Sequence, residues 1–178
     1  MRLSPPVVIL LIFFAVSALS AQVPEKGSVL PAIQFSSPLL PEDLAYLKVR
    51  GEAFAIKDVN CQVLLVEIIG VYCPFCYEQA PLFNQLFRRI EKGKLKNKVK
   101  MLGVAIGATV MEVDYLRKNG QYQYPIVRDE TFTIHKLLGE PRTPFTMLLD
   151  KEGQVLYSHL GVIKNIDDFY DSLKKLVE

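Results

Sequence analysis

Hydrophobic residues along the chain form two patterns, unbroken apolar runs and stretches in which apolar residues recur every three or four positions. Unbroken runs rich in Val and Ile are typical of β-strands buried on both faces, whereas the wider spacing is typical of a helix with one apolar face. The sequence predicts strands at 62–69, 99–106, 124–129, 144–150 and 154–161. The last two flank a turn at 151–153 and therefore predict an antiparallel hairpin.

Helices are predicted between the strands and at the end of the chain. The longest begins at Pro74, and its spaced apolar residues are Ala80, Phe83, Leu86, Phe87 and Ile90. The next starts at a capping box of Thr109 and Glu112 and stops at Gly120, after burying Val113 and Leu116.

Two further helices complete the pattern. A short one is predicted at 131–138, closed by Gly139, and a last one follows a capping Asn165. The last helix has one apolar face, formed by Ile166, Phe169, Tyr170, Leu173 and Val177. Alternation of strands and helices with a hairpin near the end predicts an α/β fold, a mixed central sheet flanked by helices.

The segment before these elements is rich in proline, with Pro24, Pro31, Pro38 and Pro41. Proline cannot donate a backbone hydrogen bond, so we predict an extended arm with at most one short edge strand near Ile33 and Phe35. A short helix then ends at Gly51. The predicted organisation is an arm and short helix at 21–50, followed by the main domain at 51–178.

The first twenty residues have the layout of a signal peptide. Thirteen uncharged residues, 7–19, follow Arg2 and end in small residues, which suits cleavage after Ser20 or Ala21. We therefore assign 1–20 to a signal peptide and expect an exported protein. The alternative is an uncleaved leader that retains the protein at the membrane.

The net charge and the length of the chain limit the functions that can be expected. The formal net charge is +2 over 178 residues, so nucleic acid is not an expected partner. A chain of this length buries a sufficient core without disulfides. The three cysteines are therefore available for chemistry.

Cys73 and Cys76 lie two residues apart where the first strong strand gives way to the longest helix. A disulfide between them closes too small a loop to stabilise the fold much. A cysteine at a helix start points its sulfur at unpaired backbone N–H groups, which favour the thiolate. We expect Cys73 to be the nucleophile and Cys76, one turn further in and more buried, to resolve the mixed disulfide.

A metal site is the main alternative. The pair could join Cys61, His135 or His159 as ligands for zinc or copper(I). A second closely spaced cysteine pair, which a structural zinc site would use, is absent from the sequence. The simpler interpretation makes Cys61 a small buried thiol and both histidines structural.

Several motifs in the same order resemble the thioredoxin fold. They are "CPFCYEQAP" with Pro81 five positions after Cys76, "TPF" at 143–145, and Gly161 before the last helix. The leader, the arm and an inserted strand–helix unit between Gln121 and Gly139 resemble secreted thiol-disulfide oxidoreductases related to cytochrome c maturation proteins and peroxiredoxin-like redoxins. The resemblance covers about residues 31–177.

This resemblance implies roles for residues around the cysteine pair. Pro144 would be a cis-proline against the pair, preceded by Thr143, and the backbone beside it would pair with an extended substrate segment. Glu67 would be a buried acid beneath the disulfide that takes the proton from Cys76.

The residues around Cys73 also set expectations. Tyr72 occupies the place where relatives commonly have tryptophan, and Pro74 and Phe75 between the cysteines offer no hydrogen bond to the Cys73 sulfur. These three are the further candidates for substrate binding. Without a donor such as histidine between the cysteines, we expect a reductant rather than a strong oxidant.

The expected function is a protein thiol-disulfide oxidoreductase, exported and periplasmic, with no organic cofactor and no metal. Its partners would be proteins bearing thiols or disulfides, with a membrane electron donor as a further candidate. A peroxidase of the peroxiredoxin type is a lesser alternative, because the threonine that such enzymes place three residues before the attacking cysteine is Gly70 here.

Overall fold

The computed structural model describes residues 22–36, 38–51 and 53–178. The predicted signal peptide at 1–20 lies outside these residues. Within the part described, no helix is long and apolar enough to cross a membrane.

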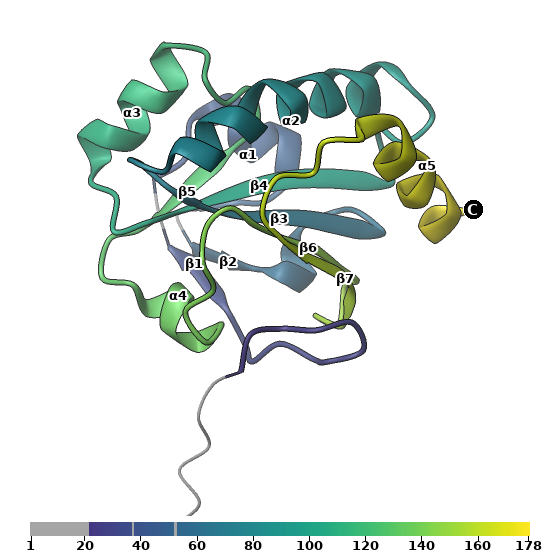
Figure 1. The fold of residues 1–178 in the computed structure, drawn as a ribbon, viewed down its shortest axis with the longest axis horizontal. Helices are drawn as coiled ribbons and strands as arrows, with labels where there is room; N and C mark the ends of the chain where they lie inside the picture. The colour runs from purple at the N-terminus through teal and green to yellow at the C-terminus, as the bar shows by residue number, and fades with distance from the viewer. Residues whose placement is uncertain (1–21, 37, 52) are drawn as a thin grey trace, which may run out of the picture.

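A five-stranded sheet in the order β5-β4-β3-β6-β7 forms the centre of the molecule (Figure 1). Its strands are β3 (Val63–Gly70), β4 (Val99–Ile106), β5 (Ile126–Asp129), β6 (Phe145–Leu149) and β7 (Val155–Leu160). β3 pairs in parallel with β4 and β4 with β5, whereas β3–β6 and β6–β7 are antiparallel. The predicted mixed sheet and hairpin are confirmed.

Helices lie on both sides of this sheet (Figure 1). They are α1 (Pro41–Leu47), α2 (Pro74–Lys92), α3 (Val110–Lys118), α4 (Thr133–Leu137) and α5 (Ile166–Val177). α2 and α5 cover one face, while α4 lies on the other with the small strands β1 (Gln34–Ser36) and β2 (Ala53–Ala55).

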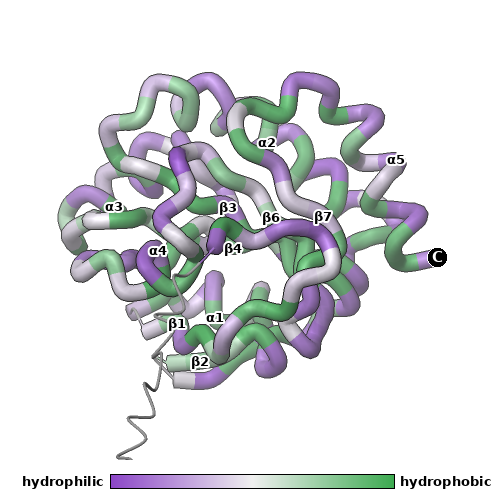
Figure 2. Tube along the Cα trace, turned by 60° about the horizontal axis from the view of Figure 1, so that its bottom comes forward, coloured by the Kyte–Doolittle hydropathy of each residue, from purple (hydrophilic) through white to green (hydrophobic). Residues whose placement is uncertain are grey.

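β3 is apolar except at Glu67 and Gly70, because both of its faces are buried. Leu65 and Ile69 point into a core shared with α2 and α5, and Leu64, Val66 and Ile68 point into a second core. Figure 2 shows how hydrophobic and hydrophilic stretches alternate along the chain. This two-sided burial places β3 at the centre and fixes the direction of the loop that follows it.

The N-terminal arm closes the second core. β1 pairs antiparallel with β2, and the rings of Phe35 and Phe54 pack with centroids 5.3 Å apart. Leu30 and Ile33 are buried in the same core. The edge strand expected near Phe35 is confirmed, but its partner β2 was not predicted.

Some helix ends differ from the prediction. The helix expected to reach Gly51 ends at Leu47, because Lys48 takes a left-handed conformation that turns Val49 into the second core. The helix expected from residue 131 begins at Thr133, after a left-handed Phe132. Backbone conformation decides both ends.

The capping signals of α3 and α5 are confirmed, whereas Val113, expected to be buried by α3, is only partly buried. Thr109 and Glu112 form the capping box of α3, and the Asn165 side chain accepts from Asp168 N at the start of α5. All five apolar residues predicted for α5 are buried.

Candidate active site

Cys73 is the N-cap residue of α2, directly after the loop that leaves β3. Its sulfur accepts a hydrogen bond from the Cys76 backbone N–H at 3.2 Å and donates one to the Thr143 carbonyl at 3.4 Å. Pro74 occupies the first turn, where its missing N–H costs nothing. The fold therefore presents the Cys73 sulfur at the positive end of a 19-residue helix.

The two cysteines differ sharply in environment. Cys73 is partly exposed, whereas Cys76 is fully buried, and both are unpaired in this structure. Burial, and then the hydrogen bond with Cys73, raise the pKa of the Cys76 thiol to about 12. Cys76 therefore needs a base to become a nucleophile near neutral pH.

Pro144 lies beside the cysteine pair, and the Thr143–Pro144 peptide bond is cis, as the resemblance implies. Thr143 provides the carbonyl that accepts from Cys73. The Pro144 carbonyl accepts from Gly161 N at 2.9 Å. The predicted residues at 73, 76, 143 and 144 thus come together at one end of the sheet.

Gly70 packs closely against Cys73 and Thr143. A Cβ atom at Gly70 would lie 3.2 Å from Thr143 Oγ1 and 3.3 Å from Cys73 Cβ. A threonine here would push both neighbours away, so the geometry gives no support to the peroxidase alternative.

Glu67 is fully buried on β3, beneath α2. The Gln79 side-chain amide donates to Glu67 Oε1 at 2.6 Å, and the Tyr124 hydroxyl donates to Oε2. Burial raises the pKa of this carboxyl to about 7, although both hydrogen bonds lower it. Gln79 follows Cys76 by three positions on the same helix face, so the carboxyl lies beneath the face that holds Cys76.

Sequence reasoning missed the residues that hold Glu67. Gln79 also accepts from Ile163 N at 2.9 Å, and Tyr122 donates to the Cys76 carbonyl at 3.5 Å. Gln79 is a polar residue on an otherwise apolar helix face, and this position could have indicated that it has a buried hydrogen-bond partner. Nothing in the local sequence pairs Tyr124 with Glu67, because the two are 57 positions apart.

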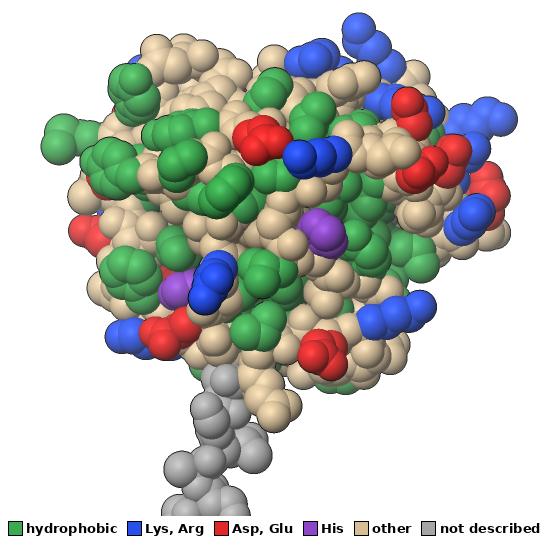
Figure 3. All heavy atoms as spheres, viewed as in Figure 1, with side chains coloured by type: hydrophobic (Ala, Val, Ile, Leu, Met, Phe, Trp, Pro, Cys, Tyr) green, Lys and Arg blue, Asp and Glu red, His purple; other side chains and the backbone are tan. Residues whose placement is uncertain are grey.

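Aromatic side chains surround Cys73 at the surface. Tyr72 is 80% exposed and Phe75 62%. The Tyr72 hydroxyl donates to Glu112 Oε1 at 2.6 Å and so links the active-site loop to α3, where Met111 is equally exposed. Figure 3 shows hydrophobic side chains gathered over α3 and the first part of α2.

The structure does not bring the candidate metal ligands together. Cys61 precedes β3 and Cys73 follows it, and eight strand residues separate the two by about 25 Å. His135 Nε2 makes a 3.0 Å hydrogen bond with the Pro141 carbonyl beside α4. Among the described residues, no three His, Cys, Asp or Glu side chains converge as a metal site.

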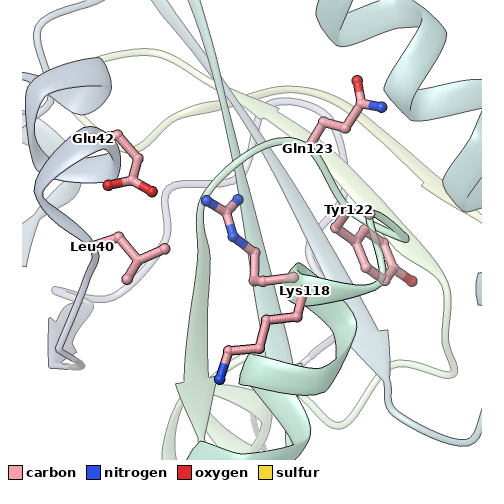
Figure 4. Close-up of a pocket in the computed structure, with 7 residues that line it drawn as sticks. Leu40, Glu42, Lys118, Tyr122 and Gln123 are labelled. Carbon is pink, nitrogen blue, oxygen red and sulfur yellow. The ribbon is translucent and has the colours of Figure 1, made fainter.

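An open pocket of about 330 Å³ lies between α1 and α3 (Figure 4). It is lined by Leu40, Glu42, Arg117, Lys118, Gly120, Tyr122 and Gln123. The Arg117 guanidinium is bonded to Asp43 at 2.6 Å and to the Tyr124 carbonyl. These bonds fix the loop that positions Tyr122 and Tyr124.

Comparison with known proteins identifies the family of this chain. Residues 25–173 match the family model described as Redoxin. The chain is 22% identical over 129 residues to the thiol-disulfide oxidoreductase ResA of Halalkalibacterium halodurans, covering 70% of each chain. It is 25% identical over 134 residues to ResA of Geobacillus thermodenitrificans, covering 74% of this chain and 75% of the relative.

Solved structures show the same fold. The thioredoxin domain of a thiol-disulfide oxidoreductase from Bacteroides vulgatus superposes with a TM-score of 0.63 at 18% identity, covering 86% of this chain and 98% of that one. A secreted thiol-disulfide isomerase from Corynebacterium glutamicum gives 0.62 at 22% identity, covering 83% and 84%. The fold is therefore the thioredoxin-like fold that the resemblance implies.

Proposed function

This chain belongs to the Redoxin family and is a thiol-disulfide oxidoreductase of the thioredoxin-like superfamily, and from this premise we propose that Cys73 and Cys76 exchange dithiol and disulfide with other proteins. The observation that supports this most is the contrast between the two sulfurs. The Cys73 sulfur is partly exposed at a helix start, while Cys76 is fully buried. An accessible attacking thiol above a shielded resolving thiol suits two-step exchange.

The reaction begins when the Cys73 thiolate attacks a substrate disulfide. One substrate sulfur leaves as a thiolate and takes a proton from water, and the other stays bound to Cys73 as a mixed disulfide. Cys76 then gives its proton to the Glu67 carboxylate and attacks the Cys73 sulfur. The substrate leaves with both sulfurs reduced, and the Cys73–Cys76 disulfide remains.

Glu67 is suited to act as the base because a pKa of about 7 lets its carboxyl both accept and release a proton near neutral pH. A more acidic carboxyl would be too weak a base toward Cys76. A carboxyl with a much higher pKa would be protonated already.

Substrate binding is assigned to the surface around Cys73. Tyr72, Pro74 and Phe75 are exposed there, and they would contact apolar side chains that flank the substrate cysteine. The backbone beside Thr143 and Pro144 would pair with an extended substrate segment.

We assign electron flow from this protein to its substrates. The Cys73 sulfur accepts from the Cys76 backbone N–H, and neither Pro74 nor Phe75 adds a side-chain donor. Fewer donors leave the thiolate less stabilised than in strongly oxidising relatives of this fold. The proposed site of action is outside the cytoplasm, with a membrane protein as electron donor, and the signal peptide predicted at 1–20 supports this proposal.

The reduction potential tests the proposal. Purified protein is equilibrated with glutathione or dithiothreitol buffers, and free thiols are counted in the unaltered protein, in Cys76→Ser and in Cys61→Ser as the matched control. We expect a two-electron couple nearer about −270 mV than about −120 mV, lost in Cys76→Ser and kept in Cys61→Ser. A potential near about −120 mV would reverse the assigned direction, and loss in Cys61→Ser would overturn the assigned pair.

A further inference from the structure

Glu67 is part of a row of four residues across the central sheet. It lies opposite Gly103 on β4 and opposite Thr146 on β6. Thr146 in turn lies opposite His159 on β7. Directly opposite residues point to the same face, with Cβ atoms about 4.5–5.5 Å apart, so these side chains share the face covered by α2 and α5.

Most sides of the Glu67 carboxyl are closed. On the β4 side, Gly103 has no side chain and the Tyr124 ring occupies the space above it, with Tyr124 Cε2 3.5 Å from a Cβ built there. Gln79 uses its amide toward Glu67 and its oxygen toward Ile163 N. The ionisable groups on these sides are the thiols of α2 and two phenols, those of Tyr122 and Tyr124.

The β6 side is different. The Thr146 hydroxyl is fully buried and has no hydrogen-bond partner among the described residues. A buried hydroxyl without a partner is uncommon and costs about 1–3 kcal/mol. Beyond it, His159 is partly exposed on the edge strand β7, and its ring stacks on Tyr157 with centroids 6.3 Å apart.

We infer that Thr146 and His159 form a proton exit that connects the buried Glu67 carboxyl to solvent. This inference rests on the proposed function, in which Glu67 receives the Cys76 proton. The protonated carboxyl passes that proton through a bridging water to the Thr146 oxygen, while the Thr146 hydroxyl proton moves through a second water to an imidazole nitrogen of His159. Imidazole accepts and donates protons near neutral pH, and His159 releases the proton to solvent.

The exit matters because neither Glu67 nor Cys76 is exposed. When Glu67 is already protonated, it must lose that proton before it can accept the one from Cys76. Thr146 and His159 therefore act as positioning residues, which set how fast the base is regenerated without touching the reacting sulfurs.

The test uses the full chain and dithionitrobenzoate as the substrate. Cys73 attacks the reagent and releases one coloured thionitrobenzoate, and Cys76 then attacks the mixed disulfide and releases a second. The second phase reports the step that needs Glu67, and the first phase is an internal control for folding. The variants are Thr146→Val and His159→Gln, with Thr146→Ser as the control that keeps the hydroxyl.

For the unaltered protein and Thr146→Ser, we expect a second phase with a single exponential between about pH 6 and pH 8. For Thr146→Val and His159→Gln, we expect the second phase to split. The slow part, about tenfold slower, is the fraction in which Glu67 was protonated at the start. Free imidazole should restore one exponential in His159→Gln but not in Thr146→Val, and the first phase should be unchanged throughout.

A single second phase of unaltered rate in both variants would overturn the proton exit while leaving the proposed function intact. Equal rescue of both variants by imidazole would also overturn it, because the proton would then leave by another path. Absence of a Cys76-dependent second phase in the unaltered protein would overturn the proposed function, and the exit with it.

Discussion

Each cysteine of this protein has a reactivity set by where its sulfur lies. The Cys73 sulfur is at the surface, while the Cys76 and Cys61 sulfurs are buried. Burial raises the pKa of Cys76 to about 12 and that of Cys61 to about 11. Both therefore remain thiols at neutral pH, and thiols are poor nucleophiles compared with thiolates.

Alkylation should follow this order. Iodoacetamide added to the reduced native protein at neutral pH is expected to modify Cys73 first, and to reach Cys76 and Cys61 only after urea is added. Peptide mapping by mass spectrometry measures the three sites separately. Modification of Cys61 at the rate of Cys73 would contradict the burial described here.

Glu67 should make stability depend on pH. Its pKa is raised from 4.5 to about 7 in the folded state, so between these values the folded protein binds more protons than the unfolded chain. Stability then falls as pH rises through this range, by about 3 kcal/mol at most. Glu67→Gln removes this dependence.

Urea unfolding of the reduced protein near pH 4.5 and near pH 8 measures this pH dependence of the free energy of unfolding. The stability of Glu67→Gln relative to the unaltered protein is expected to increase by up to about 3 kcal/mol between the two pH values. Parallel pH curves for the two proteins would show that Glu67 is not buried as a titrating group.

At the scale of elements, Gln79 joins three parts of the fold. Its side chain connects α2 to Glu67 on β3 and to the backbone of Ile163, in the segment before α5. Gln79→Leu leaves Glu67 Oε1 and Ile163 N buried without these partners. Each lost partner costs about 1–3 kcal/mol.

We therefore expect Gln79→Leu to lower the free energy of unfolding by about 2–6 kcal/mol and to slow the Cys76 step. Asn165→Ala is the matched control, because it removes only the cap of α5 and should cost about 1 kcal/mol without affecting exchange. Denaturant unfolding and exchange kinetics separate the two effects. Equal exchange rates in both variants would show that Gln79 does not influence the step at Cys76.

The elements also show what the sequence could predict. β4 was predicted at its observed bounds, because a mostly apolar run of eight residues is typical of a buried strand. Cys73, Cys76 and Pro144 were singled out from local motifs, and the structure places them together. β2 is only three residues long and forms through pairing with β1, and Tyr124 meets Glu67 only through the completed sheet. Both depend on contacts distant in sequence, which local patterns do not encode.

At the scale of the whole molecule, the sheet separates two cores with different tasks. One core supports the cysteine pair, and the other holds the arm. Phe35 lies on the arm side, 1% exposed. Its loss should therefore affect folding and leave the redox chemistry unchanged.

Phe35→Ala is expected to lower the free energy of unfolding by about 3–5 kcal/mol and to leave the reduction potential unchanged. Val29→Ala serves as the control on the same arm, since Val29 is 67% exposed and should cost less than about 0.5 kcal/mol. Urea unfolding followed by circular dichroism measures the first effect. A shifted potential in Phe35→Ala would show that the two cores are coupled.

The arm has one more consequence, which concerns association between molecules. Residues 27–30 make backbone hydrogen bonds with the start of β7, from Gly27 N to Val155 O, Val155 N to Ser28 O and Leu30 N to Gly153 O. β7 is an edge strand, and an edge with free backbone groups is a template for aggregation. By occupying one end of that edge, the arm shortens the surface on which another sheet could dock, and so lowers the tendency of molecules to aggregate through β7 at high concentration.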